Sequence, residues 1–142
     1  MSFDQDPGES VTMSAADLAQ LVNQRDELQA ELDRLKAGLS PAVLSIIAER
    51  CRQVQMLGWT PAHDDEHDAG ELAGAASAYA AHASDALHPF SQGDAFRDGT
   101  VPDGWCWGTE WWKPGKPMRN LEKAGALIVA EMERMVRQGG AA

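Results

Sequence analysis

Apolar side chains recur at intervals of three and four residues along much of this chain, which is the spacing of a helix that buries one face. No stretch alternates β-branched and polar residues in the way that a half-buried strand does. The pattern predicts helices at about residues 14–37, 41–57, 70–87 and 119–137. We therefore expect an all-α fold: an N-terminal coiled-coil-like helix, followed by a compact three-helix domain with a long structured loop rich in Trp, Pro and Gly.

The first predicted helix carries leucines at coiled-coil spacing, and Ser14 can act as its N-cap. The heptad a positions are Leu18, Arg25 and Leu32, and the d positions are Leu21, Leu28 and Leu35. This apolar stripe is narrower than the face that a helix presents to a globular core. We expect residues 14–37 to pair with the same helix in other copies and form a homo-oligomer; packing against the chain's own domain is the alternative.

The remaining sequence predicts one helical domain at residues 39–138. A flexible tail (1–12) and an oligomerisation helix (13–38) precede it, and a flexible C-terminus (139–142) follows. The expected apolar faces of its first and last helices are Leu44, Ile47, Cys51 and Val54, and Leu121, Ala124, Ile128, Met132 and Met135. The helix at 70–87 contains eight alanines, which would let a neighbouring helix approach closely.

The charge balance bears on possible ligands. The chain has 12 Lys and Arg against 22 Asp and Glu, a net charge of −10, which disfavours general binding to nucleic acid or anionic lipid. Between positions 111 and 123, however, four basic residues stand against one acidic residue. A positive spot on a negative protein attracts small anions, and indole rings can stack on a nucleobase.

This basic segment predicts a binding site for a small anionic ligand. Its residues are Trp111, Trp112, Lys113, Lys116 and Arg119. Two alternatives stay open: the tryptophans and prolines of the segment form a structural scaffold, or the segment contacts a partner protein.

A second group of residues could bind a divalent metal. Five carboxylates and two imidazoles lie between positions 63 and 71. If this stretch is helical, His63, His67 and Glu71 share a face that suits a transition metal, and in a loop the carboxylates suit Mg²⁺. The predicted ligands for Mg, Mn or Zn are Glu49, His63, Asp64, His67 and Glu71. Alternatively, the acidic residues cap the helix that follows or are solvated charges.

The two cysteines, Cys51 and Cys106, do not form a CxxC pair, so the sequence has no zinc-ribbon or redox motif. We expect Cys51 to be a small buried residue on the apolar face of its helix. The N-terminal segment lacks the pattern of a signal peptide, and no stretch has the roughly 18 apolar residues of a membrane span. A cytoplasmic location with reduced thiols is therefore expected.

Three segments carry a recognisable pattern. They read AERCRQVQMLGWTPAHDDEHDAGEL (48–72), WCWGTEWWKPGKP (105–117) and RNLEKAGALIVAEMERM (119–135). Together they resemble a family of small accessory proteins encoded by tailed bacteriophages and prophages. The resemblance implies a phage origin and an accessory role in the cytoplasm of the host bacterium. The leucine stripe lies outside the matching segments.

The chain also has a distant similarity to the MazG-like nucleotide pyrophosphohydrolases, which are all-α oligomers. In that family, acidic residues on neighbouring helices bind magnesium beside a nucleotide. The similarity would assign this role to Glu49, Glu71 and Glu131. The chain departs from the family pattern, because its second and third predicted helices lack the paired Glu-x-x-Glu and Glu-x-x-Asp elements.

These observations predict a phage-encoded accessory protein that binds a small anionic, nucleotide-like ligand without turnover. Sequestering a nucleotide that signals host defence would be one use of such binding. The first alternative is a metal-dependent, MazG-like nucleotide pyrophosphohydrolase. The second is an inhibitor or adaptor that binds a host protein.

Overall fold

The computed structural model describes residues 12–90 and 100–139, and the regular secondary structure within these ranges is entirely helical. The all-α prediction is therefore confirmed for the described residues. The tail predicted at 1–12 and the C-terminus predicted at 139–142 lie outside them, apart from positions 12 and 139. No helix of the described ranges is long and apolar enough to cross a bilayer.

The chain divides into two units, Met1–Ser40 and Pro41–Ala142. The first unit contains α1 (Ala15–Ala37). The second contains α2 (Pro41–Leu57), α3 (Pro61–Asp65), α4 (Glu71–Leu87), the short 3-10 helix η2 (Thr109–Trp111) and α5 (Pro117–Arg137). These bounds agree closely with the four predicted helices. The five-residue α3 was not expected as a separate element.

Helix α1 begins with a capping box. The Asp17 amide donates to Ser14 Oγ (3.1 Å), and the Ser14 amide donates to Asp17 Oδ2 (3.3 Å). All of α1 lies within the described residues, and none of its side chains is buried. The exposed fraction of the stripe leucines ranges from 43% at Leu32 to 71% at Leu28. The stripe is therefore an apolar surface that nothing within its own unit covers.

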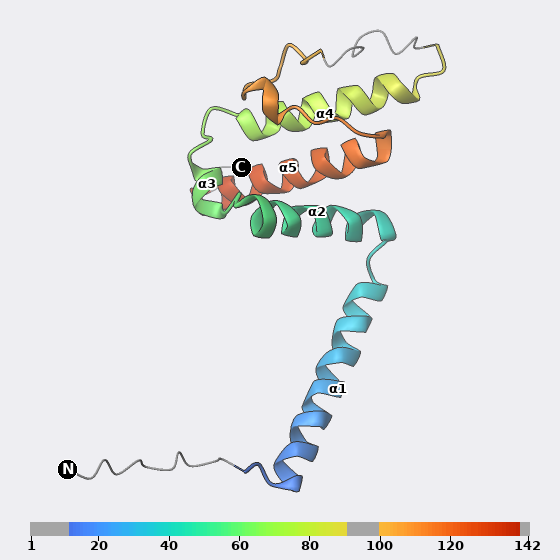
Figure 1. Ribbon diagram of the computed structural model, residues 1–142, viewed down its shortest axis with the longest axis vertical. Helices are drawn as coiled ribbons and strands as arrows, with labels where there is room; N and C mark the ends of the chain where they lie inside the picture. The colour runs from blue at the N-terminus through green and yellow to red at the C-terminus, as the bar shows by residue number, and fades with distance from the viewer. Residues whose placement is uncertain (1–11, 91–99, 140–142) are drawn as a thin grey trace, which may run out of the picture. The chain divides into compact units, whose positions relative to one another are not determined.

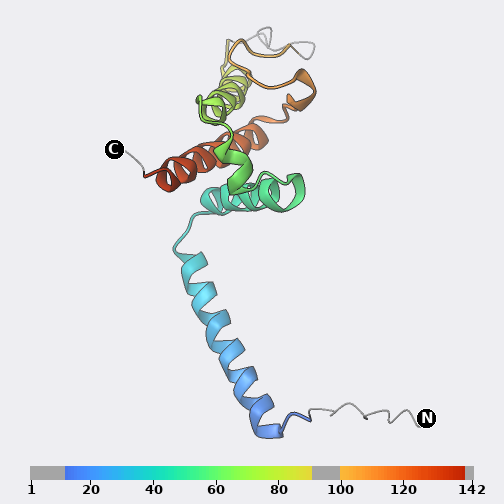
Figure 2. The ribbon, with the colours of Figure 1, turned by 90° about the vertical axis from the view of Figure 1, so that its left-hand side faces the viewer.

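In the second unit, α5 lies between α4 and α2, as both Figure 1 and Figure 2 show. The core forms where α4 meets α5. Its buried members are mostly small: Leu72, Ala75, Ala76, Ala78 and Tyr79 from α4, Ala124, Leu127 and Ala130 from α5, and Trp112 from the loop between them. The predicted close approach of a neighbour to the alanine-rich helix is confirmed, and that neighbour is α5.

The apolar faces predicted for α2 and α5 are largely wrong. On α2, Ile47 and Cys51 are exposed, while Glu49, Arg50 and Gln53 are buried. On α5, Ala124 is buried as expected, but the other residues of the predicted stripe are exposed: Leu121, Ile128, Met132 and Met135. Both cysteines are free thiols at exposed positions, so the expectation for Cys51 is also wrong.

The reason for this difference is that charged side chains pair inside the second unit. Glu49 of α2 forms an ion pair with Arg119 of α5, and Arg50 of α2 forms one with Asp64 of α3. A hydrophobic periodicity assigns such residues to the solvent side, whereas paired and hydrogen-bonded charges can be buried. At the α2–α5 contact, a Cβ built on Gly125 would lie 2.8 Å from Ile46 Cδ1, so the glycine permits this approach.

Candidate functional site

Two adjoining cavities in the second unit bring aromatic and cationic side chains together. The larger, of about 370 Å³, is lined by Leu57, Trp59, His63, Asp64, His67, Leu72, Trp107, Gly108 and Trp111. The smaller, of about 150 Å³, is lined by Glu49, Arg52, Gln53, Leu57, Trp59, Tyr79, Trp111, Lys113, Lys123 and Leu127. We call them the aromatic cavity and the cationic cavity. Because Leu57, Trp59 and Trp111 belong to both linings, the two cavities share a wall.

The lysines of the cationic cavity come from two segments that hold each other in place. Lys113 follows η2, and its amide donates to Tyr79 Oη on α4 (3.3 Å). Lys123 lies on α5, and its ammonium donates to the Lys113 carbonyl and sits 5.1 Å from the centroid of the Tyr79 ring. The ammonium of Lys113 lies 5.9 Å from the centroid of the Trp111 ring. Both lysines therefore line one cavity, and both of their charges lie beside aromatic faces.

The lining of the cationic cavity includes a buried carboxylate, Glu49, that two guanidinium groups hold. Arg52 donates to both oxygens of Glu49 (Nε to Oε2, 2.8 Å; Nη2 to Oε1, 2.9 Å), and Arg119 donates to Oε2. Burial alone would raise the pKa of the Glu49 carboxyl, but the hydrogen bonds and charges of Arg52 and Arg119 outweigh burial and lower that pKa. The two arginines thus balance the negative charge of Glu49. This carboxylate therefore does not offset the positive charges of Lys113 and Lys123.

The ammonium of Lys123 is held in an environment that disfavours its charge. Burial, reinforced by the positive charge of Arg119, lowers the pKa of this lysine. Burial also raises the pKa of the Tyr79 hydroxyl beneath it. An anion in the cavity would counter both effects on Lys123, because it would replace lost hydration and supply a negative charge.

One polar atom in the lining of the cationic cavity is unpaired. The Gln53 side chain is buried, and its Nε2 donates to Glu49 Oε1 (3.3 Å). Its Oε1 has no hydrogen-bond partner in the part of the chain that the structure describes. A carbonyl oxygen can only accept, so this position suits a hydroxyl or amine of a ligand.

The aromatic cavity is built around α3 and the turn before it. Gly58, at φ +73°, ends α2 in a conformation that favours glycine, and Thr60 caps α3 by accepting from the His63 amide (3.3 Å). The rings of Trp59 and His63 are parallel within 4°, with centroids 6.3 Å apart. His67 continues this row, 4.9 Å from His63 and 5.4 Å from Trp107. The result is a wall of rings on one side of the cavity.

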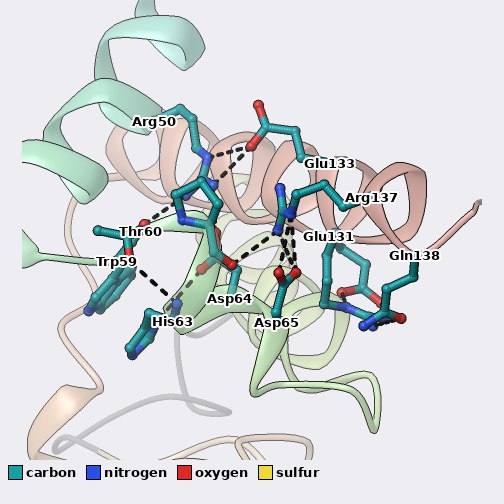
Figure 3. Close-up of polar contacts among 12 residues, drawn as sticks. Arg50, Trp59, Thr60, His63, Asp64, Asp65, Glu131, Glu133, Arg137 and Gln138 are labelled. Carbon is teal, nitrogen blue, oxygen red and sulfur yellow. Dashed lines mark hydrogen bonds and ion pairs between the residues drawn. The ribbon is translucent and has the colours of Figure 1, made fainter.

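Arginines from two helices fix the position of α3, as Figure 3 shows. Arg50 of α2 donates to the fully buried carboxylate of Asp64 and to Glu133 Oε2 (2.9 Å). Arg137 of α5 donates to Asp65 Oδ1 (2.8 Å) near the surface. Asp64 is therefore a partner in a buried ion pair, which is neither the helix cap nor the metal ligand that the sequence suggested.

The five predicted metal ligands do not form one site. Across residues 12–90 and 100–139, no three His, Cys, Asp or Glu side chains are placed to hold an ion. Glu49 and Asp64 are paired with arginines, and Glu71 accepts from the Ala69 amide (2.8 Å). Since α3 ends at Asp65, His63, His67 and Glu71 do not share a helix face.

The MazG-like ligand set does not assemble either. Glu131, its third member, is bound to Arg134 of the same helix, with Nη2 of the arginine 2.9 Å from Oε1 of the glutamate. Glu49 and Glu71 have the partners given above. The donor set therefore does not fit a metal centre of that kind.

The predicted ligand residues are brought together only in part. Trp111, which is 49% exposed, and Lys113 line the cationic cavity, and Arg119 adjoins it through Glu49. Trp112 is 7% exposed and belongs to the core, and Lys116 is the exposed residue that precedes α5 and is outside both linings. The two cavity linings therefore do not include these two predicted residues.

Other lining residues could not be identified from the sequence segment alone. Lys123 lies four residues after Arg119 and belongs to the basic segment, so helical spacing gave a signal for it, but it is not among the predicted ligand residues. Arg52, Gln53 and Trp59 lie more than 50 positions upstream, and only the packing of α2 against α5 brings them to the cavities.

The chain was compared with protein-family models, with curated proteins and with solved structures, and none of them matches it.

Proposed function

We propose that this protein binds a small, nucleotide-like anion without turning it over, and that the phosphate groups occupy the cationic cavity. The observation that carries the proposal is the lining of this cavity. Arg52, Lys113 and Lys123 face a single carboxylate, Glu49, which Arg52 and Arg119 already hold. In a chain of net charge −10, this local surplus of positive charge concentrates small anions and not extended polyanions.

The chemistry of the lining suits phosphate. Each lysine ammonium offers three donors, and charge-assisted hydrogen bonds to phosphate are among the strongest in proteins. Trp111 stands in the shared wall with half of its surface exposed, so a planar group can stack on it next to a bound phosphate. The phage origin implied by the sequence resemblance would make the ligand a host nucleotide that the protein sequesters in the cytoplasm.

Binding without turnover is favoured by the state of the nearby carboxylates. A general base needs a free lone pair and a pKa near the working pH. Glu49 accepts from two arginines and has a lowered pKa, and Asp64 is buried against Arg50. Both groups are therefore poor bases, which disfavours the pyrophosphohydrolase alternative.

A second candidate function, binding of a host protein, is favoured by the outer side of α5. Large apolar residues are exposed along this helix: Met118, Leu121, Ile128, Met132, Met135 and Val136. Exposed apolar patches of this kind commonly mark protein interfaces. Binding of a host protein in place of a small anion predicts a stable complex that forms without nucleotide.

The first test compares three lysines in the intact protein. Lys113→Ala and Lys123→Ala are each expected to weaken binding of nucleoside diphosphates by about 10- to 100-fold, since each removes a charge-assisted hydrogen bond. Lys116→Ala removes the same charge from the same segment but outside the linings, so its affinity is expected to stay at the wild-type value. Quenching of the tryptophan emission during titration with ADP, GDP, CDP and UDP measures the affinity of the wild type and of the three variants. Equal losses in the three variants would contradict the proposal.

We also propose that the α1 stripe pairs with a second copy of α1. Leu28→Lys at a d position is expected to dissociate the assembly, because the exposed stripe would lose an apolar contact and gain a charge. Ala30→Lys, on the opposite side of the heptad, is the matched control and is expected to keep the wild-type mass. Light scattering measures the mass of each full chain. An unchanged mass for Leu28→Lys would show that α1 is not the assembly element.

A further inference from the structure

The aromatic cavity has the size and chemistry of a site for an uncharged ring. Its volume of about 370 Å³ lies within the range of small-molecule pockets and equals roughly a dozen water volumes. Five of its lining residues are aromatic: Trp59, His63, His67, Trp107 and Trp111. Its one carboxylate, Asp64, is already paired with Arg50. The lining contains no other carboxylate and no Lys or Arg.

Trp107, one of the residues that line this cavity, carries a buried donor that lacks an acceptor. Trp107 Nε1 is shielded from solvent and has no hydrogen-bond partner among residues 12–90 and 100–139. An indole N–H can only donate, and a buried donor that stays unpaired is costly. A ring nitrogen or carbonyl oxygen of a ligand would satisfy it, as a nucleobase edge does and a hydrocarbon ring does not.

The unpaired acceptor in the neighbouring cavity adds a third requirement. Gln53 Oε1 lies in the lining that also holds Lys113 and Lys123. A ligand that spans the shared wall would therefore lie beside stacked rings and the residue with the unpaired N–H donor on one side, and beside cations and the residue with the unpaired carbonyl acceptor on the other. In a nucleotide, the base would accept from the N–H and stack on the rings, a sugar hydroxyl would donate to the carbonyl, and the phosphate would pair with the cations.

We infer that the aromatic cavity binds the heteroaromatic ring of a nucleotide, with Trp107 Nε1 donating to an acceptor on the ring edge and Trp111 forming the wall between ring and phosphate. The inference rests on the proposed function, because it takes the phosphate to lie in the cationic cavity. The inference adds to the proposed function that tight binding of the ligand requires its base as well as its phosphate. A quaternary ammonium could also contact indole faces, but Lys113 and Lys123 in the neighbouring cavity would repel it.

The test uses ligands with and without the ring on the intact protein. Pyrophosphate supplies the anion alone, and ADP, GDP, CDP and UDP supply anion and ring together. At least one of these four is expected to bind ten or more times more tightly than pyrophosphate. Trp107→Phe keeps an aromatic ring but removes the N–H, and is expected to weaken that nucleotide by about three- to tenfold while leaving pyrophosphate unchanged.

Trp112→Phe is the matched control, because it removes another buried and unpaired indole N–H, which lies in the core and outside both linings. It is expected to leave nucleotide affinity at the wild-type value. If pyrophosphate binds and none of the four nucleotides binds more tightly, the inference is overturned and the proposed function stands. The inference also fails if Trp107→Phe weakens pyrophosphate as much as nucleotide. If neither pyrophosphate nor any nucleotide binds, the proposed function itself fails.

Discussion

Replacing Arg50 by alanine is expected to destabilise the second unit by about 3–5 kcal/mol, which is the typical effect of removing one partner from a buried ion pair. The guanidinium connects Asp64 of α3 with Glu133 of α5, and the Asp64 side chain is 1% exposed. Without Arg50, this carboxylate would be buried with no opposite charge. A domain of ordinary stability has only about 5–15 kcal/mol to lose, so the variant would lie near the limit of folding.

Urea unfolding followed by circular dichroism measures this effect. Arg137→Ala is the matched control, since Arg137 also joins α5 to α3 through Asp65, but near the surface, where an ion pair contributes little. Its unfolding midpoint is expected to stay close to that of the wild type. The double variant Arg50→Met/Asp64→Leu removes both charges and is expected to recover most of the lost stability. Equal destabilisation by Arg50→Ala and Arg137→Ala would contradict the buried pair.

Leu127→Ala is expected to destabilise the same unit by about 2–5 kcal/mol, because it empties space between α4 and α5. Leu127 is 2% exposed and is the largest side chain that α5 contributes to the core. The other buried members of this core are mostly alanines, which are too small to fill the space left by the leucine.

The control for Leu127→Ala is a substitution at the next residue, Ile128. Ile128 is 49% exposed, so Ile128→Ala is expected to change the unfolding free energy by less than about 1 kcal/mol. Thermal and urea unfolding of both variants measure the difference. The pair also tests the orientation of α5, because the sequence pattern assigns Ile128 to the core. A larger loss for Ile128→Ala than for Leu127→Ala would mean that the helix is turned the other way.

The helices of this protein are readable from its sequence because their ends depend on local signals. Ser14 caps α1, Pro41 begins α2, and Gly58 ends it, each through contacts within a few residues. Which face of a helix is buried depends instead on partners that are distant in the chain. The burial of Arg50 on α2 depends on Asp64 and Glu133, and no apolar periodicity contains that information.

The candidate site, like the fold, was predictable from the sequence only where its residues are neighbours in the chain. Trp111 and Lys113 are close together in the sequence, and both line the cavity. Lys116 and Lys123 look alike in a charge pattern, but Lys116 precedes α5 while Lys123 lies on the side of α5 that faces Tyr79. The acidic stretch with His63 and His67 resembles a metal site because its composition does not reveal that arginines from α2 and α5 pair with two of its carboxylates, Asp64 and Asp65.

The most direct test of the proposed function is calorimetric titration of the intact protein with pyrophosphate, near neutral pH and at low salt. We predict saturable binding of one pyrophosphate per chain, which weakens as salt is added and is lost in the double variant Lys113→Ala/Lys123→Ala. Binding by the double variant as tight as that by the wild type would contradict an anion site in the cationic cavity. So would the absence of saturable heat with millimolar pyrophosphate and with each of the four nucleoside diphosphates.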